Sequence, residues 1–457
     1  MPSYQTALAR MYALGHELSH TPSHKFDLAH MRVLLNALDH PERNFPGVII
    51  AGTNGKGSTA ATLASILRAS GLRAGLYTSP HLVRINERIQ INGEEISGDD
   101  FALLHDLADR IAEGLVSEGK LPWHPSFFEM LTAMAFEYFS RRKVDIAVLE
   151  VGMGGRLDAT NVVEPRVSVI TDISLDHQKF LGDTITEIAR EKAGIIRPGG
   201  IVVTLPQHPE ANDVIGNTIL QLGAQAVSAV PYVPPVSPAS EEYGAGQGVS
   251  RYTLQVMGRQ IQVETPLLGR HQLRNIALAI AAAEELSKQG FPVTPETIER
   301  GIRETRWPGR FQVVAATAGT PEYVLDVAHN PAGAWALRST LSARYGDRPF
   351  TMVFGAMRDK AIGEIAEILF PLAERVIATR AESPRSATPD EIRESAARVS
   401  AQLEPAATVA EALRTAATGA GQAGLVVVTG SIYIVGEAMQ ALALQSSTSP
   451  LVAGRSR

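Results

Sequence analysis

Apolar runs alternate with amphipathic segments through the first part of the chain. Four runs rich in β-branched residues have the length of buried strands, at residues 48–51, 144–150, 167–171 and 201–205. Helical periodicity is seen at residues 59–68, 99–117, 127–142 and 185–194. Strands and helices in alternation predict parallel βαβ units, and therefore an α/β fold with a doubly wound, mostly parallel sheet.

A second α/β pattern begins after Trp307-Pro-Gly-Arg310. Strands are expected at residues 323–327, 350–354, 375–379 and 425–429, with helices between them. These strands carry few charges, so helices should cover both faces of their sheet. We therefore predict an N-terminal domain over residues 1–305 and a smaller, Rossmann-like domain over residues 306–457.

Two other segments interrupt the first pattern. Residues 231–248 contain four prolines and three glycines, which favours a surface excursion over a packed helix or central strand. Residues 252–256 and 260–263 flank a short turn and predict a hairpin at an edge of the sheet, and residues 271–289 predict a long helix.

The composition narrows the class of protein. With 457 residues and 45% hydrophobic content, the chain can bury more than one core. A formal net charge of −6 argues against a broad nucleic-acid footprint, because such proteins gather excess Lys and Arg. The sequence has no cysteine, which excludes disulfides and thiolate chemistry, and no uncharged apolar run of membrane-spanning length. We expect a cytoplasmic protein that binds neither nucleic acid nor membranes.

The most informative segment is Ala51-Gly-Thr-Asn-Gly-Lys-Gly-Ser-Thr59, which follows the first strand and precedes a helix. Its glycines let backbone N–H groups approach an anion, Lys56 adds a positive charge, and the helix N-terminus favours the same anion. The segment departs from the usual P-loop pattern, because Gly57 separates Lys56 from Ser58 and the upstream glycine is missing. Its context still predicts a phosphate site for a nucleoside triphosphate.

Polar residues follow two further strands at the same edge of the predicted sheet. Glu150 ends one strand and is a candidate magnesium ligand, since Mg²⁺ prefers carboxylate, hydroxyl and phosphate oxygens. Asp172, Asp176 and His177 follow another strand, and His177 is a candidate ligand there. The turn at residues 152–155 could be a second anion nest, although a tight turn required by packing is favoured.

Two other features have ordinary explanations. Lys192 lies near a predicted helix end, where most lysines are solvated and complement the helix dipole. His16-Glu-Leu-Ser-His20 matches the pattern of zinc proteases, but Pro22 follows, which places His20 at the end of any helix. We do not expect a zinc site there.

Further motifs occur in order over most of the chain: Gly52-Thr-Asn-Gly-Lys-Gly-Ser58, Thr78-Ser-Pro-His-Leu82 with Asn86-Glu-Arg-Ile89, Leu149-Glu-Val-Gly-Met-Gly-Gly-Arg-Leu-Asp-Ala-Thr-Asn161, Leu175-Asp-His177, Arg190-Glu-Lys-Ala-Gly194, Gly269-Arg-His-Gln272, Trp307-Pro-Gly-Arg310 and Asp326-Val-Ala-His-Asn330. Together they resemble the folylpolyglutamate synthase and dihydrofolate synthase family, a branch of the Mur ligases. The extra glycine of the P-loop is usual in that family.

The resemblance implies an ATP-dependent ligase that forms an acyl phosphate, which the amine of L-glutamate attacks. It implies ATP contacts from Thr53, Asn54, Gly55, Lys56, Gly57, Ser58, Asn275, Arg310 and Asp326. It implies Mg²⁺, expected as two ions, held by Ser79, Glu150, His177 and a carbamylated Lys192. Catalysis would depend on Lys56, His177 and Lys192. Dihydropteroate or folate would contact Asp27, Leu28, Pro80, His81, Leu157, Asp158 and Ala159.

Alternatives remain at this stage. The chain could carry both synthase activities or only the folylpolyglutamate synthase activity. Another Mur-type ligase is less favoured, because it would normally have an added domain before its P-loop. A nucleotide-binding switch without catalysis is the alternative from another class, followed by a zinc hydrolase. We expect a monomer whose two domains close over the nucleotide.

Overall fold

The computed structural model describes residues 3–15, 28–235, 249–317, 319–399, 402–421 and 423–443. Its larger sheet has the strand order β4-β3-β2-β5-β1-β6-β7-β8. The pairs from β2 to β8 are parallel, whereas β3 and β4 add antiparallel strands at one edge. These strands are β1 (Gly47–Ala51), β2 (Ala74–Tyr77), β3 (Ile89–Ile91), β4 (Glu94–Glu95), β5 (Ile146–Glu150), β6 (Pro165–Ile170), β7 (Ile201–Thr204) and β8 (Gln225–Ser228).

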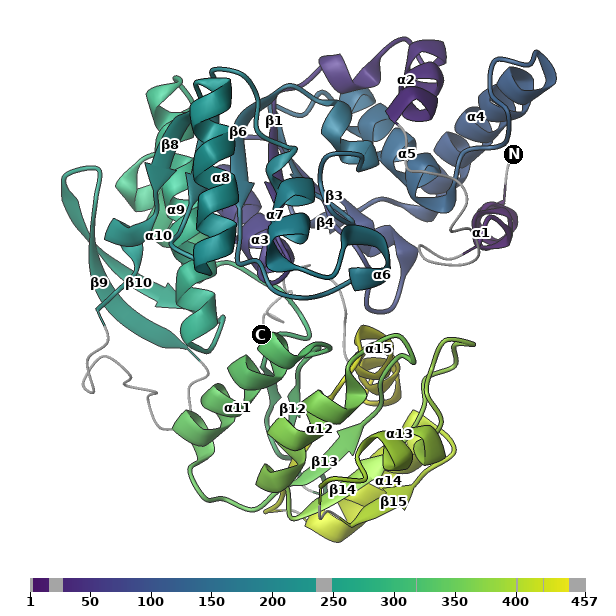
Figure 1. The fold of residues 1–457 in the computed structure, drawn as a ribbon, viewed down its shortest axis with the longest axis vertical. Coiled ribbons are helices and arrows are strands. Elements are labelled where there is room, and N and C mark those ends of the chain that lie inside the picture. Colours follow the sequence, from purple (N-terminus) through teal and green to yellow (C-terminus); the bar gives the residue numbers. More distant parts are fainter. Residues whose placement is uncertain are drawn as a thin grey trace, which may run out of the picture.

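Helices cover both faces of this sheet because its central strands are apolar on both sides (Figure 1). One face packs against α3 (Lys56–Ala69), α9 (Arg270–Lys288) and α10 (Pro295–Arg303). The other face packs against a larger set: α1 (Tyr4–Ala13), α2 (Leu28–Ala37), α4 (Gly98–Ser117), α5 (Phe127–Arg141), α7 (Ile185–Ala193) and α8 (Pro209–Leu222). The predicted doubly wound fold is confirmed.

The predicted hairpin is present after β8. Strands β9 (Ser250–Val256) and β10 (Arg259–Thr265) pair only with each other and do not extend the large sheet. Alternate apolar residues of both strands join the core that contains α10. The hairpin therefore forms a sheet of its own, and its apolar face is covered by helices. Residues 236–248 of the predicted excursion lie outside the described residues.

The second sheet has the order β11-β12-β16-β13-β14-β15 and is parallel except at β11. Its strands are β11 (Gln312–Val314), β12 (Glu322–Leu325), β13 (Thr351–Phe354), β14 (Arg375–Ala378), β15 (Leu403–Pro405) and β16 (Leu425–Thr429). One face packs against α11 (Pro331–Tyr345), α12 (Ile362–Leu369) and α13 (Pro389–Ser395), and the other against α14 (Val409–Ala420) and α15 (Ile432–Ala441). Helices cover both faces, as predicted.

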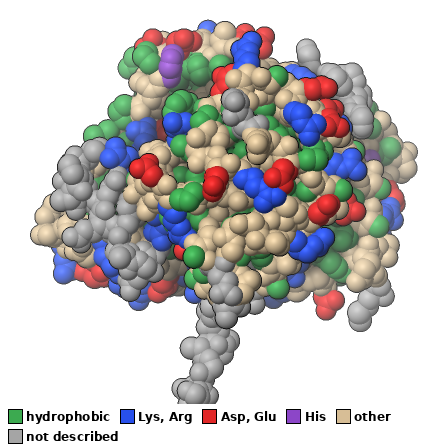
Figure 2. Space-filling model, turned by 90° about the horizontal axis from the view of Figure 1, so that it is seen from below, with side chains coloured by type: hydrophobic (Ala, Val, Ile, Leu, Met, Phe, Trp, Pro, Cys, Tyr) green, Lys and Arg blue, Asp and Glu red, His purple; other side chains and the backbone are tan. Residues whose placement is uncertain are grey.

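The two α/β units lie one above the other (Figure 1). On the side of the six-stranded sheet, Lys and Arg side chains are interspersed with Asp and Glu side chains over the face seen in Figure 2. Within the described residues, no helix is both long and apolar enough to cross a membrane.

Candidate active site

The glycine-rich loop leaves β1 and is fixed against the segment that follows β6. The Thr53 amide donates to the Asp172 carbonyl at 2.9 Å, and the Thr53 hydroxyl donates to the Ser174 carbonyl at 3.0 Å. Asn54 Nδ2 donates to Ser174 Oγ at 3.0 Å. A Cβ atom on Gly52 would lie 1.8 Å from the Thr171 hydroxyl, so only glycine fits there. The segment that follows β6 therefore holds the loop in place through hydrogen bonds to Thr53 and Asn54.

Helix α3 begins at Lys56, three residues earlier than the pattern predicts, so its first turn belongs to the loop. Gly55 precedes it with φ 91°, a conformation that favours glycine. A Cβ on Gly55 would lie 2.1 Å from Asn275 Oδ1, and one on Gly57 would lie 2.7 Å from the Trp307 ring. These glycines allow close approach of other side chains, while the free amides of the first turn can receive an anion.

Two lysines converge on the carbonyl of Gly52. Lys56 Nζ donates to the carbonyls of Gly52 and Thr53, both at 3.2 Å, and Lys192 Nζ donates to the Gly52 carbonyl at 2.7 Å. Lys192 is only 4% exposed. Burial, together with the nearby charge of Lys56, lowers the pKa of Lys192 to about 7. The expectation of a solvated helix-end lysine is therefore wrong, because the last turn of α7 packs beneath the loop.

Glu150 lies where β5 ends, and its side chain is buried. Its Oε2 accepts a hydrogen bond from the amide of Ser79 at 3.1 Å. Ser79 follows β2 and precedes a cis peptide bond to Pro80. The carboxylate and the serine are thus adjacent, and they come from neighbouring strands of the sheet.

His177 immediately precedes the short helix α6 (Gln178–Leu181) and has a left-handed conformation, with φ 52°. Burial lowers the pKa of His177 to about 3; Asp176 opposes this shift, while the charges of Lys360 and Lys56 add to it. The imidazole is therefore neutral at pH 7, which is the form that binds metals.

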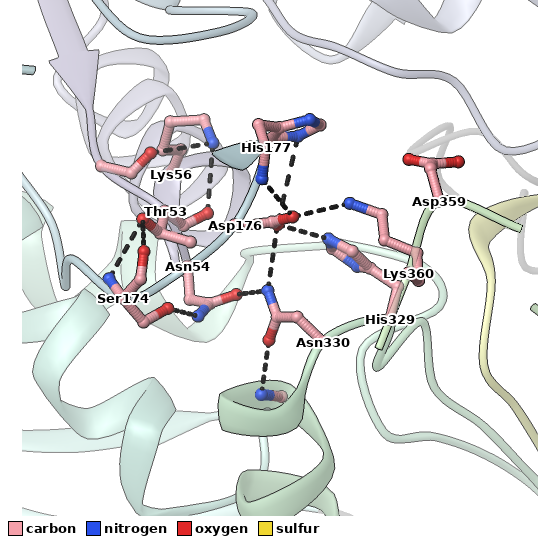
Figure 3. A network of polar contacts seen from close by, with 12 residues as sticks. Thr53, Asn54, Lys56, Ser174, Asp176, His177, His329, Asn330, Asp359 and Lys360 are labelled. Carbon is pink, nitrogen blue, oxygen red and sulfur yellow. Dashed lines mark hydrogen bonds and ion pairs between the residues drawn. The ribbon is translucent and has the colours of Figure 1, made fainter. Parts of the chain in front are cut away.

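Asp176 joins the two sheets through side chains from the second domain (Figure 3). Its carboxylate accepts hydrogen bonds from Lys360 Nζ at 2.7 Å and Asn330 Nδ2 at 3.2 Å, and His329 Nε2 lies 3.4 Å away. Burial would raise the Asp176 pKa, but the hydrogen bond to His329 and the surrounding positive charges lower it instead. The carboxylate is ionised and contacts both domains.

Asn330 strengthens this contact by linking the loop to a helix of the second domain. Its Nδ2 donates to Asn54 Oδ1 at 3.0 Å, and its Oδ1 accepts from the Gly333 amide at 2.8 Å, where it caps α11. No role was predicted from the sequence for His329, Asn330 or Lys360. The motif that ends at Asn330 contained two of them, whereas nothing local indicated Lys360.

Arg310 and Asp326 form a second group near the domain junction. Asp326 accepts hydrogen bonds from the amides of Phe311 at 2.8 Å and Ala328 at 2.9 Å. Burial raises the Asp326 pKa, opposed by the charge of Arg310. Burial lowers the Arg310 pKa, and the charges of Asp326 and Glu150 oppose that shift. The charge of Arg310 therefore interacts with carboxylates of both domains, Asp326 and Glu150.

The residues expected to contact a pterin or folate are less uniformly placed. His81 Nδ1 accepts a hydrogen bond from Arg88 Nε at 2.8 Å, and Leu28 begins α2. Asp158 is buried and accepts from the amides of Thr160 and Met153, both at 3.0 Å. Its carboxylate therefore stabilises its own loop. Leu157 and Ala159 flank it, while Asp27 lies outside the described residues.

The glycine-rich turn at residues 152–155 is explained by packing. A Cβ on Gly152 would lie 2.6 Å from the Phe128 ring, and one on Gly155 would lie 2.8 Å from the Glu191 carbonyl. The preference for a tight turn over an anion nest is supported. His16 and His20 of the zinc-protease pattern lie outside the described residues.

Comparison with known proteins identifies the family. Residues 126–283 match the Mur ligase middle domain, and residues 309–432 match the glutamate ligase domain of Mur ligases. The folylpolyglutamate synthase of Lacticaseibacillus casei is 40% identical over 346 residues, which are 74% of this chain and 78% of that protein. The chain belongs to the folylpolyglutamate synthase and dihydrofolate synthase family.

Other members of this family cover nearly the whole chain. The dihydrofolate synthase/folylpolyglutamate synthase of Bacillus subtilis is 34% identical over 418 residues, which are 90% of this chain and 93% of that protein. The Mycobacterium tuberculosis folylpolyglutamate synthase, solved with ADP and AMPPCP, has a TM-score of 0.85 and 31% identity; the match covers 96% of this chain and 99% of that one. The two-sheet architecture is thus that of the family.

Some of the residues predicted to bind Mg²⁺ have donor atoms that suit a hard cation. Glu150 and Ser79 offer adjacent oxygens, and His177 offers a neutral nitrogen. Within the described part of the chain, no group of three or more His, Cys, Asp or Glu side chains is arranged to hold a metal. Lys192 as a free amine is no ligand for Mg²⁺, and it fits the set only in a form that carries oxygens.

Proposed function

We propose that this protein is an ATP-dependent ligase that adds L-glutamate to dihydropteroate and to the glutamate tail of folates. It would act as a monomer, because one chain supplies both walls of the site. We also propose that it is cytoplasmic. The observation that carries the proposal is the convergence of the glycine-rich loop, Glu150 and buried Lys192 with Lys360 and Asn330 of the second domain, in a chain of this family.

The loop at residues 53–58 would bind the phosphates of ATP through its amides and Lys56, and Asn275 lies against it. A carboxylate oxygen of the pteroate or folate attacks the γ-phosphorus; the new O–P bond gives an acyl phosphate and ADP leaves. The approach of two anions is unfavourable, and the charge of Lys56 offsets their repulsion. The neutral amine of L-glutamate then attacks the acyl carbon, phosphate leaves, and the amide nitrogen loses a proton.

Ser79, Glu150 and His177 would hold Mg²⁺ beside the phosphates. When bound, Mg²⁺ would neutralise charge on the phosphoryl group that is transferred. The hydrogen bond between the Ser79 amide and Glu150 would keep the carboxylate at the end of β5. The low pKa of His177 would keep its nitrogen unprotonated at neutral pH.

Lys192 is proposed to be carbamylated and to hold a second Mg²⁺. Its amine would add to CO₂ and release one proton, which gives an N-carboxylate. This reaction requires the neutral amine, and burial beside Lys56 lowers the pKa of Lys192 to about 7, so that a substantial fraction is neutral. The modification would also place a negative charge next to Lys56 in place of a second cation.

Domain contact is proposed to complete the site. The domains would divide at residues 305 and 306, and Arg310 and Asp326 would contact ATP from the second domain. Asp176 holds Lys360 and Asn330 at the junction, which supports closure over the acyl phosphate and exclusion of water. The pterin would lie near Asp27, Leu28, Pro80, His81, Leu157, Asp158 and Ala159.

Release of phosphate from ATP tests the function. The purified protein is given ATP, Mg²⁺ and L-glutamate with either dihydropteroate or tetrahydrofolate. Phosphate release that requires both co-substrates supports the ligase, and activity with only tetrahydrofolate would restrict it to folylpolyglutamate synthase. Nucleotide binding without turnover in either mixture would contradict the proposal and favour a switch.

A further inference from the structure

An ion pair between Asp172 and Arg274 joins the segment that follows β6 to helix α9. Arg274 Nε lies 3.0 Å from one carboxylate oxygen of Asp172, and its Nη2 lies 2.6 Å from the other. Two parallel charge-assisted hydrogen bonds fix the direction as well as the distance of the contact. These hydrogen bonds raise the pKa of Arg274. The two side chains are thus held in one relative orientation.

The backbone of Asp172 supports the glycine-rich loop. Its carbonyl accepts hydrogen bonds from the amides of Thr53 at 2.9 Å and Asn54 at 3.1 Å. Those two amides therefore anchor the loop. The amides of residues 55–58 lie at the N-cap and in the first turn of α3, where the helix itself supplies no acceptor for them. Asp172 thus separates the amides that anchor the loop from those that can receive a phosphate.

Arg274 connects this support to two further elements. Its Nη2 also donates to the Pro206 carbonyl at 2.9 Å, in the segment that follows β7. The next residue of α9, Asn275, is 4% exposed, and the Thr59 hydroxyl of α3 donates to its carbonyl at 3.3 Å. The guanidinium therefore ties Asp172 to the end of β7 and to the helix that packs beside the loop.

Other contacts limit how much depends on the ion pair. Gln207 Oε1 accepts from the Ile173 amide at 2.8 Å, and Gln207 Nε2 donates to the Thr171 carbonyl at 3.1 Å, so the backbone on both sides of Asp172 has a second support. The side chains of Arg274 and Asp172 are 32% and 38% exposed, so solvent weakens their attraction. Loss of the pair should loosen the support of the loop without unfolding it.

We propose that Arg274 and Asp172 are positioning residues for ATP: their ion pair holds the Asp172 carbonyl where it anchors the loop, so that the amides of residues 55–58 face the phosphates. This inference rests on the proposed function and adds a pair of residues to its nucleotide site. Both side chains act through the loop, which contacts ATP in the ground state and in the transition state alike. The affinity for ATP should therefore depend on the pair more than the turnover number does.

Calorimetric titration of the full chain with AMPPCP and Mg²⁺ tests the proposal. Arg274→Met and Asp172→Asn should each raise the dissociation constant about tenfold. The double variant should bind no more weakly than either single variant, because both changes remove the same ion pair. Arg274→Lys keeps the charge without the bidentate geometry and should give an intermediate value. Arg68→Met breaks an ion pair of α3 with similar exposure, 30% and 46%, and is the matched control that should bind like the parent.

Phosphate release under steady-state conditions gives a second readout. In Arg274→Met the KM for ATP should rise about tenfold, while kcat at saturating ATP should fall less than about threefold. A merely structural pair would lower Tm and leave the dissociation constant of AMPPCP unchanged, which would overturn the proposal. Fully additive effects in the double variant, or an equal loss of affinity in Arg68→Met, would also overturn it. A parent protein that binds AMPPCP but ligates no glutamate would contradict the proposed function alone, because the titration requires no turnover.

Discussion

The two edges of the large sheet differ although they share strands β1 and β6. At the carboxyl edge, Thr53, Asn54 and Asp176 are tied by hydrogen bonds to each other's segments and to the second domain. At the amino edge, Glu42 has an oxygen without a donor in the described chain, and Arg32 and Arg166 are exposed.

This difference separates an edge between two domains from an edge that one domain forms alone. The carboxyl edge gathers helix N-termini, glycine turns and a second domain, which suits a large anion that must be enclosed for chemistry. The residues that line a cavity at the amino ends of β1 and β6 all come from the first domain, so the second domain does not enclose it.

Removal of Lys56 should have the largest effect. Lys56→Ala should lower kcat by at least about a thousandfold, because the charge that stabilises phosphoryl transfer is lost. Its Tm should stay near that of the parent, since Lys56 is not a core residue. Lys120→Ala, at an exposed lysine, is the control for loss of one charge. Near-normal turnover by Lys56→Ala would remove Lys56 from the mechanism.

Lys192 distinguishes a carbamate from a simple cation. Lys192→Ala should be almost inactive yet still bind ATP, and a short carboxylic acid in the assay should restore part of its activity. Lys192→Arg should be inactive despite its charge, because a guanidinium does not form a carbamate. Phosphate release and nucleotide binding are the measurements. An active Lys192→Arg enzyme would contradict carbamylation.

Lys360→Met should weaken the contact between the domains. Lys360 and Asp176 are 10% and 8% exposed, so the change leaves a buried carboxylate without its ion pair. We expect kcat/KM to fall about a hundredfold, with ATP binding much less affected. A double-mutant cycle with Asp176→Asn measures the coupling. Additive effects would show that the ion pair does not act in closure.

The pH dependence of stability should reveal His271, at the start of α9. Burial, with the charge of Arg310, lowers the pKa of His271 to about 4, below its unfolded value near 6.5. The unfolded chain therefore binds more protons between these values, and stability should fall as pH drops through this window. The loss should reach about 2 kcal/mol at pH 5 relative to pH 7. Denaturant unfolding of His271→Gln should lack this component.

Much of the fold follows from local pattern. Strands such as β1 and β16 are continuous apolar runs and were predicted nearly to their ends. β2 was missed because its four residues include Ala74 and Gly75, which carry little strand signal. β8 and β15 were missed because their residues are mostly exposed or partly exposed at sheet edges.

The site was predictable only where a motif is contiguous. The glycine-rich loop has its function in consecutive residues, so sequence was sufficient to propose it. Lys192 shows the limit, since its burial depends on the packing of α7 beneath β1. Lys360 lies 184 residues from Asp176 along the chain, and only the tertiary fold brings them together. The residues that line the cavity at the amino ends of β1 and β6 come from two separate segments, so they form no contiguous motif in the sequence.

The contact between Trp307 and Gly57 suggests a way to detect nucleotide binding by intrinsic tryptophan fluorescence. Of the three tryptophans in the sequence, Trp123 and Trp335 are 41% and 58% exposed. The Trp307 ring instead lies against the first turn of α3, so close that a Cβ on Gly57 would be 2.7 Å from it. Indole emission responds to nearby charge and polarity, so we expect a triphosphate bound at the loop to change the fluorescence of Trp307 more than that of Trp123 or Trp335. Occupancy of the loop can therefore be followed in unlabelled protein.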